Sequence, residues 1–312
     1  MNMFYLRSRI FFGEDALAAL KDMEARNVTI ITDEFLVKNG VADRVASMIT
    51  GAREVRIFSE IRPDPPVDMI AKALEFLLET DTDTVIALGG GSSIDAAKAT
   101  VLMYEQKVGR DVKLVAIPTT SGTGSEVTRV AVVTDPEEGK KYPLFSEALL
   151  PNAAILAGDL TVSVPPAVTA HTGFDVITHA LEAYVSINAN DFTDAFAEKA
   201  LELAFTYLPI AYQEGENLRA REKMQTASCL AGMAFNDAGL GVNHGIAHAL
   251  GAVFHLPHGM ANAMLLYHVM RYNAELDTAA FAGMGLTSVN KALIRGRRRS
   301  CSEAACFVLP AR

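Results

Sequence analysis

The chain has 312 residues, of which 50% are hydrophobic and 21% are charged, and glycine and proline are modest. This length supports one large domain or two ordinary ones, and the composition excludes disordered, collagenous and disulfide-framework proteins. Lysine and arginine number 28 against 37 aspartates and glutamates, which gives a formal net charge of −9. An acidic chain is a poor general binder of nucleic acid, because neutralising phosphates requires a basic surface.

Cysteine usage and the start of the chain indicate the compartment. The three cysteines, Cys229, Cys301 and Cys306, are few for this length, which favours a reducing environment. Residues 1–7 lack the cationic start and apolar block of a secretory signal, and no apolar stretch is long enough to span a bilayer. We therefore expect a cytoplasmic enzyme with no membrane partner.

Up to about residue 160 the chain alternates short β-rich runs with helical runs. The strand-like runs are short, β-branched and mostly bounded by turn residues. The predicted strands are 28–32, 55–58, 84–88 and 114–118, and the predicted helices include 67–79 and 93–102. This alternation predicts an α/β domain with a parallel, Rossmann-like sheet and helices on both faces.

The second half of the chain differs in composition and in hydrophobic periodicity. Residues 167–272 show almost only helical periodicity and are rich in alanine, leucine and methionine. The Pro165–Pro166 pair predicts a hinge, so we expect an α/β domain over 1–160 and an all-α domain over 161–312. Residues 286–312 are atypical, with six basic residues and one acidic. They are interpreted as a solvated tail; a nucleic-acid or membrane arm is the alternative, which one short basic run supports only weakly.

Two glycine-rich turns follow predicted strands. Residues 89–93 (Gly-Gly-Gly-Ser-Ser) open a predicted helix, where unpaired amides and the helix dipole favour an anion. Residues 119–126 carry five hydroxyls and two glycines. Taken alone, the first turn is equally explained by tight packing, and the alternative for the second is a flexible surface loop. Both follow parallel strands and so share the sheet edge at which ligands of doubly wound sheets bind, and together they favour a nucleotide site.

Titratable side chains gather in the helical half, where all seven histidines follow residue 170. Asp175 and His179 are four residues apart on one helix face with apolar neighbours, and four histidines fall within 244–258. A carboxylate with three imidazoles suits a divalent transition metal, although spacing alone does not say which histidines coordinate. A metal beside a dinucleotide would activate an oxygen next to a hydride acceptor. For Asp175 and His179 alone, a solvated stripe or a simple Asp–His hydrogen bond is the alternative.

Four motifs in order resemble the iron-containing (group III) alcohol dehydrogenase family. They are residues 89–98, residues 118–128, the Asp-x-x-x-His-Ala-x-Glu-Ala motif of 175–183, and residues 243–259. The resemblance covers roughly residues 5–275, and its last motif is most similar to short-chain members of the propanol and ethanol-utilisation type. It implies a dehydroquinate synthase-like architecture. The chain's Arg- and Cys-rich end does not resemble the family's continuation, which predicts a truncated or altered C-terminus.

The resemblance implies a role for each matched residue. Asp175, His179, His244 and His258 would hold the metal, usually Fe²⁺ and sometimes Zn²⁺, and His248 would be a catalytic proton-relay or positioning group near the substrate. The implied NAD contacts are Asp33, Gly90, Gly91, Ser92, Asp95, Thr119, Thr120, Thr123, Lys141 and Leu160. A carboxylate at Asp33 would accept the ribose hydroxyls and repel a 2′-phosphate, which favours NAD over NADP.

The implied function is reversible hydride transfer between NAD(H) and a small primary alcohol or aldehyde. The resemblance also implies a homodimer, for which residues 4–12 would supply a shared edge strand. One alternative is an NAD- and metal-dependent lyase of the dehydroquinate synthase type, which would need basic residues near the histidines to hold a phosphorylated substrate. A second alternative is an inactive remnant that binds nucleotide or metal. One departure from the family is Asp64, where members often carry asparagine between two prolines.

Overall fold

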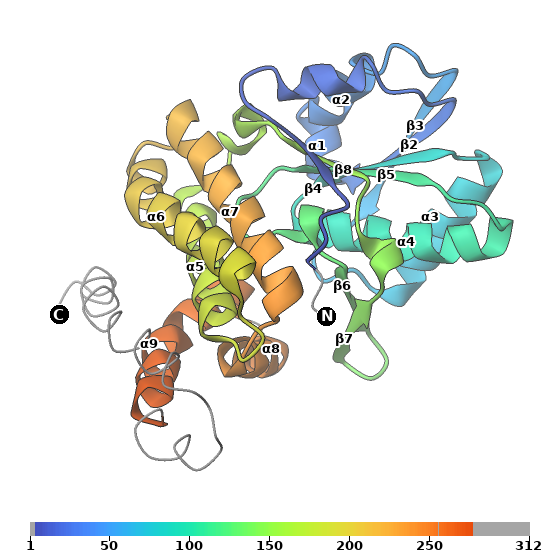
Figure 1. Ribbon diagram of the computed structural model, residues 1–312. Helices are drawn as coiled ribbons and strands as arrows, with labels where there is room; N and C mark the ends of the chain where they lie inside the picture. The colour runs from blue at the N-terminus through green and yellow to red at the C-terminus, as the bar shows by residue number, and fades with distance from the viewer. Residues whose placement is uncertain (1–3, 255, 277–312) are drawn as a thin grey trace.

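The computed structural model describes residues 4–254 and 256–276, and its first half is built on one parallel sheet (Figure 1). The strands lie in the order β1-β8-β5-β4-β2-β3, and every neighbouring pair is parallel. Their bounds are β1 Arg9–Phe12, β2 Asn27–Asp33, β3 Glu54–Ile61, β4 Thr84–Gly89, β5 Lys113–Pro118 and β8 Ala153–Leu156. The central strand β4 is buried along its whole length, as expected for a strand covered on both faces.

Helices cover both faces of this sheet. They are α1 Glu34–Lys38, α2 Val41–Ser47, α3 Val67–Glu79 and α4 Gly91–Val108, with short 3₁₀ turns η1 Ala16–Leu20, η2 Ser125–Val127, η3 Glu147–Leu149 and η4 Gly158–Thr161. Successive strand residues point to opposite faces. Ile30 and Ile86 therefore pack in the core beneath α1 and α2, while Ile31 and Val85 pack in the core beneath α3 and α4.

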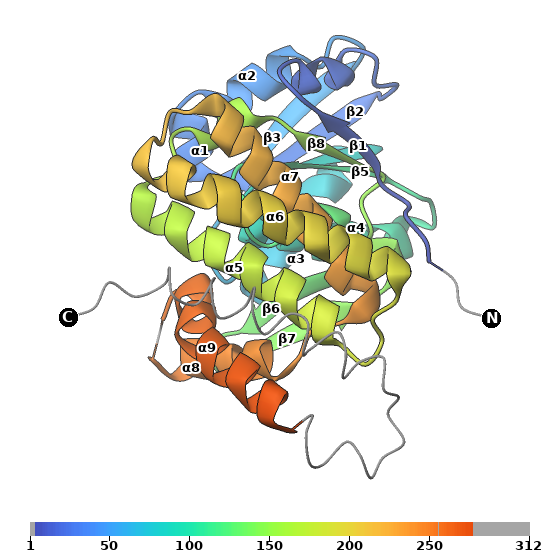
Figure 2. The same ribbon diagram turned by 60° about the vertical axis from the view of Figure 1, so that its left-hand side comes forward.

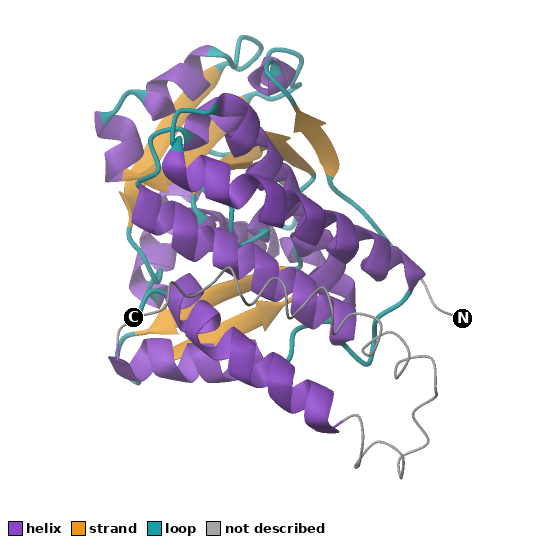
Figure 3. Cartoon of the chain, turned by 90° about the vertical axis from the view of Figure 1, so that its left-hand side faces the viewer, coloured by secondary structure: helices purple, strands orange, loops and turns teal. Residues whose placement is uncertain are grey.

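A two-stranded hairpin follows residues 119–126, which are called the hydroxyl-rich loop below. Strands β6 (Val130–Asp135) and β7 (Lys140–Phe145) pair antiparallel, and Gly139 takes a left-handed φ of 62° in the turn between them. The hairpin stands apart from the main sheet and lies beside the end of the helical layer that holds α8 and α9 (Figure 3).

The second half of the described chain is helical. Its helices are α5 Pro166–Val185, α6 Asp191–Gln213, α7 Leu218–Ala238, α8 Val242–Phe254 and α9 His258–Leu276. Helices α5, α6 and α7 lie side by side as one layer, with α8 and α9 at one end of it (Figure 2). Alanine dominates the core between them, as at Ala180, Ala200 and Ala227. Small side chains let the helix backbones approach closely.

The predicted architecture is confirmed: a parallel α/β sheet followed by a helical part. Helix α3 occupies the predicted residues 67–79, and the four predicted strands lie within β2 to β5. Strand β8, helices α1 and α2 and the β6–β7 hairpin were not predicted. Within residues 4–254 and 256–276, no helix is both long and apolar enough to cross a bilayer. The expectation for residues 286–312 lies outside the described residues.

Candidate metal centre and cofactor site

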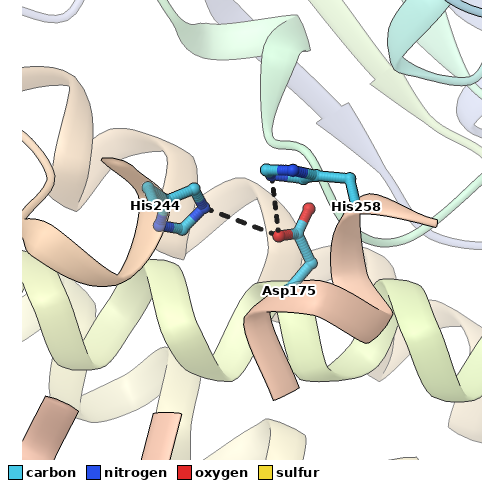
Figure 4. A group of neighbouring side chains, drawn as sticks. All are labelled: Asp175, His244 and His258. Atoms are coloured by element: carbon cyan, nitrogen blue, oxygen red, sulfur yellow. Dashed lines mark ion pairs between the residues drawn. The ribbon is translucent and has the colours of Figure 1, made fainter. Parts of the chain in front are cut away.

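Three of the predicted metal ligands converge from three helices (Figure 4). Asp175 projects from α5, His244 from α8, and His258 is the first residue of α9. The Oδ1 atom of Asp175 lies 3.6 Å from Nε2 of His244 and 3.5 Å from Nε2 of His258. Asp175 and His244 are buried and His258 is half-buried, so the set is most accessible at His258.

A glycine allows the start of α9 to reach α5. A Cβ on Gly259 would overlap the carbonyl oxygen of His171, which lies on α5 one turn before Asp175. Glycine is the residue that permits such a close approach of two backbones. The Pro257-His258-Gly259 sequence, predicted as a helix junction, therefore places the His258 ring over Asp175.

Asn262 lies at the centre of the three donor atoms. Its Nδ2 atom is 2.7 Å from Oδ1 of Asp175 and 3.1 Å from Nε2 of both His244 and His258. The Oδ1 atom of Asn262 accepts a hydrogen bond from Nδ2 of Asn243, so its amino group faces the donors. Three electron-pair donors thus point at one small polar volume.

The charge states of the cluster suit a cation. The pKa of Asp175 is lowered: burial would raise it, but the positive fields of His179, His258 and His244 outweigh burial. Burial lowers the pKa of His179 to about 3, and burial also lowers the pKa of His258. At neutral pH these groups are therefore a carboxylate and two neutral imidazoles, the forms that bind metal.

His244 differs from the other histidines. Burial lowers its pKa, but hydrogen bonds and charges from Asp175 and Glu182 outweigh this and raise the pKa to about 9. Its Nε2 atom must give up a proton before it can coordinate an ion, so metal binding at neutral pH releases a proton from this ring.

His179, the fourth predicted ligand, lies one ring away from the converging donors. Its imidazole stacks on that of His244 at 4.5 Å and on Phe235 at 4.4 Å between ring centroids. Its Nδ1 atom is buried and has no hydrogen-bond partner among the described residues. An orphaned imidazole nitrogen beside one carboxylate and two further imidazoles fits a divalent transition metal such as Fe²⁺ or Zn²⁺.

His248, the predicted catalytic histidine, lies at the exposed rim of the cluster. Its ring centroid is 5.0 Å from that of His258 and 6.0 Å from that of His244. Desolvation, followed by the positive fields of His258, His244 and Lys141, lowers the pKa of His248 to about 4. The ring is therefore neutral at pH 7 and able to accept a proton.

The glycine turn (residues 89–93) and the hydroxyl-rich loop (residues 119–126) pack against each other at the carboxyl ends of β4 and β5. This side of the sheet is called the cofactor edge below. A Cβ on Gly90 would lie 3.3 Å from Oγ1 of Thr120, and one on Gly91 would lie 2.6 Å from Cγ2 of Thr123. The backbone N–H of Thr119 donates to the carbonyl of Gly89 at 3.0 Å. Because Gly90 caps α4, the turn offers the unpaired amides of a helix start to a ligand at this edge.

Asp33 lies at the end of the neighbouring strand β2. One oxygen, Oδ1, accepts the backbone N–H of Leu36 and caps α1. The other, Oδ2, lies 3.6 Å from where a Cβ on Gly89 would stand, so it is close to the glycine turn. This places a carboxylate oxygen beside the candidate phosphate cradle.

The hydroxyl-rich loop also touches the helices that carry the metal donors. A Cβ on Gly122 would lie 2.8 Å from Cβ of Thr172 on α5, and a backbone hydrogen bond with Gly122 favours the charged form of His179. Lys141 in the hairpin is close enough for its charge to lower the pKa of His248 and His258. The cofactor edge and the donor cluster therefore adjoin.

Family profiles cover most of the chain. The profile described as "Iron-containing alcohol dehydrogenase" matches residues 7–157, and that described as "Fe-containing alcohol dehydrogenase family, C-terminal" matches residues 169–306. The chain belongs to the iron-containing alcohol dehydrogenase family. The predicted resemblance and enzyme class, a metal-dependent alcohol oxidoreductase, are thereby confirmed, and this favours the oxidoreductase over the lyase alternative.

Relatives and solved structures of the family agree with this assignment. The chain is 50% identical over 281 residues to 1-propanol dehydrogenase PduQ of Citrobacter freundii, covering 90% of this chain and 76% of the relative. It superposes on sulfoacetaldehyde reductase from Bifidobacterium kashiwanohense in complex with NAD⁺ with a TM-score of 0.83 and 33% identity, covering 88% and 77% of the two chains. For 1,3-propanediol oxidoreductase the TM-score is 0.82 with 34% identity, covering 96% and 86%.

Two predicted cofactor residues of this family member point into protein rather than into the edge. Both carboxylate oxygens of Asp95 are used, accepting from Oγ of Ser125 at 2.6 Å and from the backbone N–H of Val132 at 2.9 Å. Leu160 is buried in the core beneath α1 and α2. These contacts give both residues a supporting position behind the cofactor edge.

Asp64, the departure from the family pattern, bridges the glycine turn and the hairpin. Its backbone N–H donates to Oγ of Ser92 at 3.4 Å, and its Oδ1 atom pairs with Nζ of Lys141 at 2.5 Å. Its φ of 55° is a left-handed conformation that asparagine and aspartate tolerate better than most residues. Asp64 thus links Ser92 of the glycine turn to Lys141 of the hairpin through one hydrogen bond and one ion pair.

Glu182 and Asn262 contact the predicted ligands, but neither was assigned a role from the sequence; Glu182 appeared there only as the glutamate of the 175–183 motif. Glu182 lies seven residues after Asp175 on α5, and Asn262 lies one turn after His258 on α9. The signals in the sequence were this helical spacing, which would place each on or near the ligand face, and for Glu182 its place in the 175–183 motif.

Proposed function

We propose that this chain is an NAD(H)-dependent, iron-containing alcohol dehydrogenase that interconverts a small primary alcohol and its aldehyde. The observation that carries the proposal is the convergence of Asp175, His244 and His258 beside a loop that packs on the glycine turn. Support for a short substrate comes from relatives named for 1-propanol and 1,3-propanediol.

Four residues would hold the metal: Asp175, His179, His244 and His258. When bound, iron supplies Lewis-acid polarisation of a substrate oxygen, and the nicotinamide supplies the hydride acceptor or donor. The protein contributes the ionised carboxylate of Asp175 and the neutral imidazoles of His179 and His258, and His244 joins them after losing a proton. In this buried setting electrostatic interactions are stronger than in water. The half-buried side of the set, at His258, is the side from which a substrate would enter.

The cofactor would lie along the carboxyl edge of the sheet. The amides of Gly90, Gly91 and Ser92 would hold the pyrophosphate, and Thr119, Thr120, Thr123 and Lys141 would line the cleft, with Asp95 and Leu160 supporting it. Asp33 would accept the adenosine ribose hydroxyls, since its Oδ2 lies beside the turn. Its negative charge would repel a 2′-phosphate, so NAD is favoured over NADP.

His248 would take part in proton transfer as the catalytic histidine. It lies at the exposed rim next to His258 and is neutral at pH 7 because its pKa is about 4. A neutral imidazole at the exposed rim of the donor cluster can accept a proton from the alcohol during oxidation and return one during aldehyde reduction.

The assembly and compartment are proposed on separate grounds. Strand β1 is the edge of the sheet and pairs only with β8 among the described strands, so its other side is open for a second copy. We propose a cytoplasmic homodimer joined through residues 4–12, with a domain boundary near residue 160 between β8 and α5.

A substrate panel under anaerobic conditions tests the function. The purified protein loaded with Fe²⁺ should oxidise NADH in stoichiometric amounts with propanal or butanal, and should use NADPH less well. Turnover of a phosphorylated substrate with NAD recycled rather than consumed would support the lyase alternative. Binding of NADH or of metal, with no turnover of propanal or butanal, would support the inactive remnant.

A further inference from the structure

Glu182 is a buried carboxylate behind the metal donors. It lies on α5 and is only 2% exposed. Its Oε2 atom is 2.5 Å from Nδ1 of His244, and its Oε1 atom accepts the backbone N–H of Asn243 at 2.8 Å. That N–H belongs to the first turn of α8, where helix amides have no partner within the helix. One side chain therefore satisfies the start of α8 and contacts a predicted ligand from behind.

The contact determines which nitrogen of His244 is free. When Nδ1 carries the proton donated to Glu182, Nε2 keeps its lone pair, and Nε2 is the atom that faces Asp175. A carboxylate behind a ligating imidazole fixes the tautomer and ring orientation and makes the ring a better donor. The contact also separates the roles of two acidic residues, because Asp175 faces the ion and Glu182 faces away from it.

The surroundings leave Glu182 little freedom to move. A Cβ on Gly241 would lie 2.8 Å from Oε1 of Glu182. The chain entering α8 thus passes directly over the carboxylate. The orientation of His244 is set by packing and hydrogen bonds together.

We propose that Glu182 is a positioning residue for the metal centre, which holds His244 with Nε2 directed at the ion and anchors the start of α8 to α5. This inference rests on the proposed function, because it assigns His244 as a ligand. It predicts that metal affinity depends on a carboxylate that never touches the metal.

A competition titration with Co²⁺ against a chelator tests the inference. Wild type, Glu182→Gln and Gly241→Ala are compared with Glu202→Gln, an exposed carboxylate on α6 paired with Lys199. Loss of the charge in Glu182→Gln should weaken Co²⁺ affinity about 10- to 100-fold and shift the d–d absorption bands. Gly241→Ala, which crowds the carboxylate, should weaken it in the same direction. Glu202→Gln should match wild type, and thermal melting of each metal-free protein checks the fold.

The outcomes separate this inference from the proposed function. If wild type binds no Co²⁺ at one site per chain, the proposed function fails. If wild type binds but Glu182→Gln and Gly241→Ala keep wild-type affinity and spectrum, the role of Glu182 is overturned. If Glu182→Gln does not fold, the Co²⁺ affinity and spectrum of Gly241→Ala alone decide whether Glu182 positions His244.

Discussion

Gly124 in the hydroxyl-rich loop lies directly against Gly232 on α7. A Cβ on Gly124 would be 2.6 Å from Cα of Gly232, and a Cβ on Gly232 would be 2.8 Å from the carbonyl oxygen of Gly124. Gly124 also has a left-handed φ of 62°. The cofactor edge and the helical part therefore meet at a backbone-to-backbone contact that tolerates no side chain.

Replacing Gly232 with alanine should open this contact. Alanine favours a helix interior by about 1 kcal/mol over glycine, but overpacking here should cost about 1–3 kcal/mol and displace the loop. We expect a lower melting temperature and a raised KM for NADH. Gly245→Ala on α8 is the stability control, because its Cβ meets no atom within 4 Å. Gly245→Ala should leave the melting temperature unchanged or raise it. If Gly232→Ala and Gly245→Ala change the melting temperature and the KM for NADH equally, the Gly124–Gly232 contact does not position the loop.

Asp175→Asn should remove the metal while keeping the side-chain shape. The neutral amide lacks the negative charge of the Asp175 carboxylate, whose pKa is lowered in the folded chain. We expect iron content and NADH oxidation to fall on the order of 100-fold or more. His248→Gln is the comparison: it should keep the iron but slow turnover by about 10²-fold or more. Iron retained by Asp175→Asn would argue against its role as ligand.

Asp33 should control cofactor choice. Asp33→Asn keeps the cap on Leu36, because asparagine caps a helix as well as aspartate, but it removes the charge that would repel a 2′-phosphate. We expect the ratio of kcat/KM for NADPH over NADH to rise about tenfold, with little change in melting temperature. An unchanged ratio would mean that another group selects the cofactor.

Asp194 in the first turn of α6 should make stability depend on pH. Desolvation, then the charges of Glu198 and Asp191, raise its pKa to about 6 from an ordinary value of 3.8. The folded chain therefore binds this proton more tightly than the unfolded chain, so stability from this group falls as pH rises from about 4 to 6. The penalty is full above pH 6 and absent below about pH 4.

Asp194→Asn should relieve that penalty. We expect a gain below about 1 kcal/mol, because the side chain is only half-buried and solvent screens its charge. The gain should appear in thermal melts at pH 7 and vanish near pH 4. A gain that is equal at both values would assign the effect to something other than ionisation.

The sheet was largely predictable because its strands carry their own signal. Strand β5 is an apolar run after Lys113 that includes the β-branched Val115 and Ile117 and is buried beyond its first position, and the turn after it is rich in hydroxyls. Strand β7 carries no such signal: Lys140 and Tyr142 are exposed, Pro143 lies within it, and its geometry depends on pairing with β6. Strands such as β7, which form because they pair with a neighbouring strand and lack a strand-like sequence pattern, were not predicted.

The metal donors were predictable where they share a helix. Asp175 and His179 are four residues apart, whereas Glu182 meets His244 across 62 residues and Asn262 meets Asp175 across 87. Those contacts exist only because α5, α8 and α9 meet. Helix spacing alone indicated a possible ligand pair on one face of α5. The polar partners Glu182 and Asn262 became evident only from the packing of α5, α8 and α9.

An anaerobic titration of the metal-free protein with Fe²⁺, followed by NADH oxidation with propanal in the same samples, tests the central claim most directly. We expect one tightly bound iron per chain and activity that rises in proportion to the iron bound. Full activity in the metal-free protein, or iron binding that is unchanged in His258→Ala, would contradict it.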